Sequence, residues 1–101
     1  MKVYLDDLRP TPPGWTRCYW PDEVIEHLKT GKVTHLSLDH DLGDDDRGKG
    51  IDVIDWLKTA VNDGFTEIPT NIAIHSDNSI GKQYMISAIN SLNRLIANKD
   101  S

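Results

Sequence analysis

The fold is decided by the stretch His35-Leu36-Ser37-Leu38-Asp39-His40-Asp41. In it, a short and mainly apolar run of the kind that forms buried strands ends abruptly at polar residues. The same pattern occurs in Val3-Tyr4-Leu5-Asp6-Asp7 and in Asn71-Ile72-Ala73-Ile74-His75-Ser76. Runs of this length, bounded by turn residues, predict buried β-strands. A weaker fourth strand is predicted over Trp15-Thr16-Arg17-Cys18-Tyr19, which follows a turn rich in proline and glycine.

Helical patterns lie between these strands. Apolar residues at helical spacing predict helices from Pro21 to about Gly31, from about Ile51 to Gly64, and from about Ser79 onward. The proline suits a first helical turn, and the two glycines suit helix ends. The last helix is expected to carry its apolar face on Ile80, Met85, Ile89, Leu92 and Leu95 or Ile96.

The order strand, strand, helix, strand, helix, strand, helix predicts an α/β fold with right-handed crossovers and a mostly parallel sheet. The 101 residues are expected to form one domain over residues 1–101. A chain of this size favours a shallow cleft over a deep cavity.

Composition narrows the classes of partner and compartment. The formal net charge of −5 argues against duplex nucleic acid, which needs clustered Lys and Arg. Cys18 is the only cysteine, so it excludes an internal disulfide and fits a reducing compartment. No apolar run reaches the roughly 20 residues that a membrane span needs. We therefore expect a cytoplasmic protein without a membrane partner, and the residues leave its oligomeric state open.

The three best-defined strands end in residues that can perform chemistry. These are Asp6 and Asp7, Asp39 and His40, and His75 and Ser76. Ligands of open α/β sheets bind outside the carboxyl ends of the strands, so these groups are expected to converge there if the first strand lies centrally. The plainer interpretation is that such residues only cap the following helices.

The three acidic residues among them predict a metal site. Asp6, Asp7 and Asp39 supply the carboxylate oxygens that Mg²⁺ prefers, and an ion would relieve their mutual repulsion. The alternative for the first two is a solvated turn. A divalent cation, with Mg²⁺ as the first choice, is therefore the expected cofactor.

The two histidines at the strand ends predict acid–base chemistry. His40 and His75 each follow a buried strand directly, and imidazole titrates near neutral pH. One neutral and one charged ring could open a phosphodiester together. The other two histidines, His27 and His35, are expected to be structural.

The turn from the last strand into the last helix has the character of an anion site. Ser76, Asn78 and Lys82 offer hydrogen-bond donors there, and Gly81 permits close approach. The spacing is not that of a P-loop, and Ser79 could simply be the helix cap. Arg9 is a further candidate for phosphate binding. Residues 44–50 are expected to form a solvated loop over the site.

Several segments together make the chain resemble a known family. They are Val3–Pro10, Pro13–Trp15, Leu36–Gly43 and His75–Asn78, with Gly81 and Met85. The acidic pair, the later aspartate and the later hydroxyl residue resemble response-regulator receiver domains, and the whole set is similar to cyclic-phosphate-processing receiver domains.

The resemblance implies a receiver-like (flavodoxin-like), three-layer domain with a four-stranded sheet of order 2-1-3-4, and action on cyclic phosphates of nucleotide-like molecules. Receivers also carry a lysine after a fifth strand. This chain offers no obvious counterpart, which weighs against phosphotransfer from a histidine kinase.

These observations lead to one main hypothesis and two alternatives. The main one is a phosphoesterase acting on the cyclic phosphate of a small nucleotide-like substrate. In it, His40 and His75 are catalytic, the three aspartates hold metal, and Arg9, Ser76, Asn78 and Lys82 bind phosphate. The first alternative is a non-catalytic receiver-like module that binds a phosphorylated ligand or a protein. The second is a phosphoacceptor domain modified on Asp39.

Overall fold

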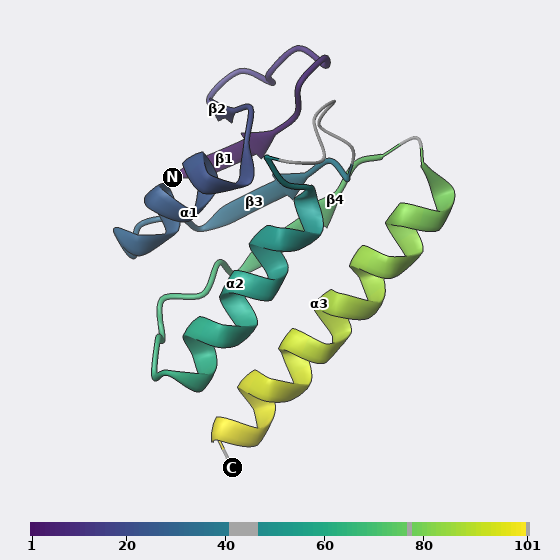
Figure 1. The fold of residues 1–101 in the computed structure, drawn as a ribbon. Helices are drawn as coiled ribbons and strands as arrows, with labels where there is room; N and C mark the ends of the chain where they lie inside the picture. Colours follow the sequence, from purple (N-terminus) through teal and green to yellow (C-terminus); the bar gives the residue numbers. More distant parts are fainter. Residues whose placement is uncertain (41–46, 77, 101) are drawn as a thin grey trace.

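The predicted order of elements is confirmed by a computed structural model that describes residues 1–40, 47–76 and 78–100. The elements are β1 (Lys2–Leu5), β2 (Thr16–Cys18), α1 (Pro21–Lys29), β3 (His35–Leu38), α2 (Gly50–Asn62), β4 (Asn71–Ile74) and α3 (Ser79–Asp100) (Figure 1). The loop predicted over residues 44–50 falls in part, at residues 44–46, outside the described residues.

The sheet is parallel throughout and has the order β2-β1-β3-β4, which confirms the expected α/β receiver-like topology. Its backbone ladder continues one residue past the strands. The Asp39 N–H donates to the Leu5 carbonyl at 3.0 Å, and the His75 N–H donates to the Leu38 carbonyl at 2.9 Å. This continuation brings the first residues after β1, β3 and β4 side by side.

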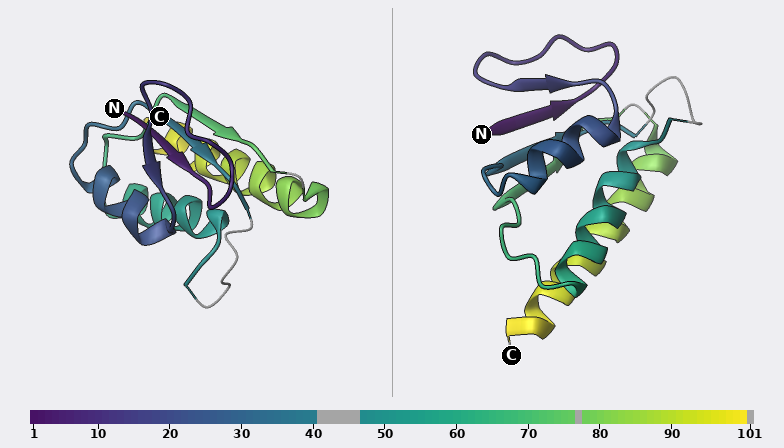
Figure 2. Two further views of the ribbon diagram at one scale, coloured as in Figure 1. Left: turned by 90° about the horizontal axis from the view of Figure 1, so that it is seen from above. Right: turned by 60° about the vertical axis from the view of Figure 1, so that its left-hand side comes forward.

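The described residues form two layers rather than the three that were expected. All three helices cover one face of the sheet, and α2 packs against both α1 and α3 (Figure 2). Leu5 and Leu36 are fully buried on that face, whereas the alternating residues Tyr4 and Ser37 point to the other face. The second face has no helical cover among these residues.

The missing third layer has a local cause. The connection from β1 to β2 is the only crossover without a helix in the described part of the chain. It contains Pro10, Pro12 and Pro13, and proline breaks a helix by removing a backbone donor and clashing with the preceding turn. A loop therefore stands where a covering helix would be needed.

The helix boundaries follow the sequence signals. Pro21 is the first residue of α1, and the Glu23 carboxylate accepts hydrogen bonds from the backbone N–H groups of Tyr19 and Trp20, both at 3.0 Å. Helices α1 and α2 each end just before a glycine of positive φ, 74° at Gly31 and 101° at Gly64. A side chain is strained in that conformation, so glycine fits there.

The long helix α3 buries most of the predicted face but not its first member. Met85 and Leu92 are fully buried against α2 and the sheet, whereas Ile80 is 65% exposed. Placing Ile80 on the core face was wrong. It precedes Met85 by five positions, about 140° around an α-helix, and it shares an exposed stripe with Tyr84. None of the helices in the described part of the chain has the length and hydrophobicity that a bilayer crossing requires.

Candidate active site at the carboxyl edge of the sheet

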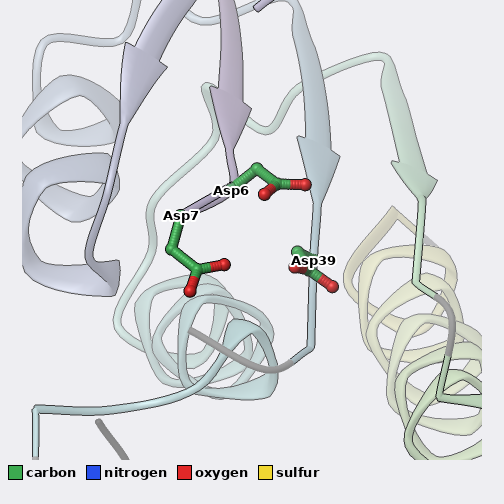
Figure 3. A group of neighbouring side chains, drawn as sticks. All are labelled: Asp6, Asp7 and Asp39. Carbon is green, nitrogen blue, oxygen red and sulfur yellow. The ribbon is translucent and has the colours of Figure 1, made fainter. Parts of the chain in front are cut away.

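Three carboxylates meet where β1 and β3 end. One ligand oxygen from each of Asp6, Asp7 and Asp39 lies within 4.8 Å of the others (Figure 3). Asp6 is almost wholly buried, and the other two are half-buried. Closely spaced carboxylate oxygens are the donor set of a hard divalent cation, so these residues fit the Mg²⁺ site expected from the sequence.

The two deeper carboxylates differ electrostatically. Burial opposes ionisation of Asp6, but N–H groups of Arg9 and Leu8, at 2.9 and 2.7 Å from Oδ1, help to hold its pKa below the ordinary value. Burial raises the pKa of Asp39, and the negative charge of Asp6 raises it further. The cluster therefore contains unrelieved repulsion, which a cation would remove.

His75 is held at this cluster by three contacts. Its Nε2 lies 3.0 Å from Asp6 Oδ2, and its Nδ1 lies 2.6 Å from Ser37 Oγ. The Tyr4 ring stacks on the imidazole, with centroids 4.3 Å apart and planes only 4° apart. Burial lowers the pKa of His75 despite the nearby Asp6 carboxylate. Burial therefore favours the neutral form of the ring, and the three contacts fix its orientation.

His40 is placed by a different set of contacts. Its backbone N–H donates to Asp39 Oδ1 at 2.8 Å, and its carbonyl accepts from the Gly50 N–H at 3.1 Å. The buried ring lies against Gly81 in the first turn of α3, where a Cβ atom would come within 2.6 Å of it. The recorded contacts thus place His75 at the carboxylates and His40 at the start of α3.

Arg9 reaches the site from the β1–β2 loop. Its Nε lies 3.9 Å from Asp6 Oδ2, at the margin of an ion pair. Arg17 on β2 supports this loop, because its Nη1 donates to the Arg9 carbonyl and, at 3.3 Å, to Thr11 Oγ1. The Arg9 guanidinium therefore lies beside the carboxylate cluster.

The turn from β4 to α3 shows which residue caps the helix. The Gly81 N–H donates to Asn78 Oδ1 at 2.9 Å, and the Asn78 N–H donates to Ser76 Oγ at 3.2 Å. Asn78 is thus the cap, and the alternative that Ser79 fills this role is wrong. Lys82 is exposed on the first turn of α3. The three predicted phosphate ligands therefore share one turn, in which Ser76 and Asn78 also shape the backbone.

Two residues of the site escaped the sequence analysis. Tyr4 and Ser37 sit inside strands and were assigned to the core pattern, yet both face the side of the sheet without helices. A signal was present. A parallel strand covered on both faces is continuously apolar, whereas Ser37 interrupts the run Leu36-Ser37-Leu38 and marks a face without core contacts.

Comparison with known proteins agrees with this geometry. A family model described as "Cyclic-phosphate processing Receiver domain" matches residues 1–91, which include every strand and most of α3. No match to this chain was found among curated proteins or among solved structures.

Proposed function

Because the chain belongs to the family of cyclic-phosphate processing receiver domains, we propose that it is a phosphoesterase that opens a cyclic phosphate on a small nucleotide-like molecule. One observation carries this proposal. An oriented imidazole, His75, lies within hydrogen-bonding distance of Asp6 in a cluster of three carboxylates. Phosphate-ester hydrolysis needs both charge neutralisation and proton transfer, and this arrangement brings groups for both together.

A divalent cation would be held by Asp6, Asp7 and Asp39, whose oxygens lie within 4.8 Å of one another. When bound, it would neutralise phosphate charge and lower the pKa of a water molecule. The N–H groups that donate to Asp6 Oδ1 fix that carboxylate, while Oδ2 lies toward His75.

The two histidines are assigned the proton transfers. His75 lies at the carboxylates, and His40 lies next to the first turn of α3. We assign the roles of general acid and general base to these two residues together: a protonated ring gives a proton to the leaving oxygen, and a neutral ring takes one from the attacking water. Positioned acid and base groups contribute about 10²–10⁴-fold each.

Phosphate binding is assigned to Arg9 and to residues of the turn from β4 into α3. Arg9 lies beside Asp6 on the β1–β2 loop, and Ser76 and Lys82 belong to the turn that follows His75 in the chain. Asn78 contributes by capping α3, which orients the first backbone N–H groups of that helix. Positive and hydrogen-donating groups would stabilise the charge that grows on the phosphate oxygens.

A second candidate function has one observation in its favour. Both ring nitrogens of His75 are already hydrogen-bonded inside the protein, to Ser37 and Asp6. A non-catalytic module that binds a phosphorylated ligand or a protein partner would keep such a closed arrangement. It predicts saturable binding without product.

The histidine test is turnover of a panel of cyclic phosphates, followed by ³¹P NMR. We expect His75→Ala and His40→Ala to lower kcat at least about 100-fold while the circular dichroism spectrum is retained. His27→Ala on α1 is the matched control and should keep full activity. Saturable ligand binding without product in the unmodified protein would favour the binding module, and full activity in both variants would refute the mechanism.

The metal test uses Mg²⁺ and a chelator. Binding to the folded state alone raises stability, by about 2.7 kcal/mol at 100 times Kd. We expect Mg²⁺ to raise the Tm and EDTA to abolish turnover, and Asp39→Asn to lose both effects. Asp55→Asn, an exposed change on α2, should behave as the unmodified protein. A mass increase of Asp39 with a small phosphodonor would point instead to a phosphoacceptor domain.

We also propose a reducing compartment, the cytoplasm, and partners that exclude duplex nucleic acid and membranes. The single, fully buried Cys18 and the net charge of −5 support this assignment. Binding to duplex DNA at low salt would contradict it.

A further inference from the structure

A chain of hydrogen bonds joins the middle of β3 to the carboxylate cluster. Ser37 Oγ lies 2.6 Å from His75 Nδ1, and His75 Nε2 lies 3.0 Å from Asp6 Oδ2. The three residues come from the adjacent strands β1, β3 and β4 or from the residues that directly follow them. Ser37 itself is buried, and the imidazole of His75 links it to the cluster.

The direction of each hydrogen bond follows from its partners. Asp6 is ionised at neutral pH and can only accept, so His75 Nε2 carries the proton and donates it. In a neutral imidazole the other nitrogen is an acceptor, so the Ser37 hydroxyl donates to Nδ1. Donating in this way, Ser37 stabilises the tautomer that places an N–H group at the carboxylates.

The stacking of Tyr4 on His75 does not by itself determine which of two orientations the imidazole adopts. The Tyr4 ring lies nearly parallel to the imidazole and fixes its plane, but a 180° rotation about the Cβ–Cγ bond of His75 would return the imidazole to the same plane and leave the stack intact. Such a turn would move Nε2 away from Asp6. The observed orientation is held by polar partners on both sides of the ring, Asp6 at Nε2 and Ser37 at Nδ1.

We infer that Ser37 is a positioning residue that, together with the Asp6 carboxylate, holds His75 in its Nε2–H tautomer and in its orientation. The consequence for turnover rests on the proposed function, because it takes His75 as one of the two residues that transfer protons. The consequence for the imidazole itself does not, since it concerns only the resting protein. Outer-shell partners of this kind typically change activity about 10–100-fold when they are removed.

The experiment measures both consequences in Ser37→Ala, which lacks the hydroxyl, and Ser37→Thr, which keeps it. The ring ¹⁵N and ¹³C shifts of His75 report the tautomer in the metal-free protein at one neutral pH. We expect an Nε2–H tautomer in the unmodified protein and in Ser37→Thr, and a mixture in Ser37→Ala. With a cyclic phosphate that is turned over, Ser37→Ala should lower kcat about 10-fold and leave KM within about 2-fold.

A matched control is present in the same strand region. Thr34 Oγ1 lies 2.9 Å from His35 Nδ1, so Thr34→Val removes a hydroxyl–imidazole contact at an exposed position. It should change neither the His75 shifts nor turnover. A Ser37→Ala protein whose His75 spectrum matches the unmodified protein would overturn the inference, even if the enzyme is active.

The remaining outcomes separate this inference from the proposed function. The predicted shift change without turnover of any substrate would support the tautomer role and refute the phosphoesterase. Covalent labelling of Ser37 by a fluorophosphonate would overturn the inference, because it would make Ser37 a nucleophile rather than a positioning residue.

Discussion

Cys18 is a fully buried residue of β2, and burial raises the pKa of its thiol to about 11, from an ordinary 9.0. The unfolded chain therefore loses this proton first as the pH rises. The contribution of the protonated thiol to stability is complete below pH 9 and is lost between about pH 9 and about pH 11. Urea titrations at pH 7.5 and pH 10.5 measure this loss. Between these two pH values, we expect the free energy of unfolding of the unmodified protein to fall by about 2 kcal/mol more than that of Cys18→Ala. Tyr4, whose pKa is also raised by burial, is present in both proteins and cancels. An identical pH dependence in the two proteins would contradict this prediction.

Among single residues, the sequence predicted which groups would converge but not how they would touch. Asp6, Asp39 and His75 could be placed together because parallel strands end at one edge. The contacts of Tyr4 and Ser37 with the imidazole depend on which face of the sheet is uncovered. The predicted order already has no helix between β1 and β2, but a pattern of apolar runs does not reveal that the three remaining helices all cover the same face.

The close approach of α3 to the His40 ring gives a prediction about one helix. Alanine in place of a helical glycine normally stabilises by about 1 kcal/mol. At Gly81 the added Cβ would lie 2.6 Å from the ring, so we expect Gly81→Ala to destabilise instead. In a His40→Ala background the obstruction is gone, and the same change should become neutral or stabilising. Urea unfolding of the four proteins gives this coupling directly. If Gly81→Ala stabilises the otherwise unmodified chain, the His40 ring moves to make room for the Cβ atom and the prediction is wrong.

The elements themselves were predictable to within a few residues, because local chemistry fixes their ends. Pro21 begins α1, and the glycines at 31 and 64 stand just beyond α1 and α2. The face of α3 was less predictable. Ile80 is apolar but exposed, because the first turn of the helix is oriented by Gly81 against His40.

The whole molecule has one sheet face without helical cover among the described residues, and Trp15 is its main aromatic cover. The indole ring lies edge-on to Tyr4 and to His35, at centroid distances of 6.2 and 6.4 Å. We expect Trp15→Ala to lower the free energy of unfolding by about 1–3 kcal/mol in urea titrations, through lost aromatic packing. Tyr84→Ala, at a 63% exposed site on α3, is the matched control and should be nearly neutral. Equal stability of the two variants would mean that the loop before β2 contributes nothing to the fold.

The segment that leaves β3 and the one that enters α2 are joined at their bases. The Gly50 N–H bonds to the His40 carbonyl at 3.1 Å, and a Cβ at Gly50 would lie only 1.9 Å from the Asp39 carbonyl oxygen. The entropic cost of closing a loop between two fixed ends depends weakly on the length of the loop and rises by about 0.6 kcal/mol for each doubling. Insertions or grafts between these two bases would therefore be inexpensive. Evolution and protein engineers alike could lengthen or replace the sequence between His40 and Gly50 while the strands keep Asp6, Asp39 and His75 in register.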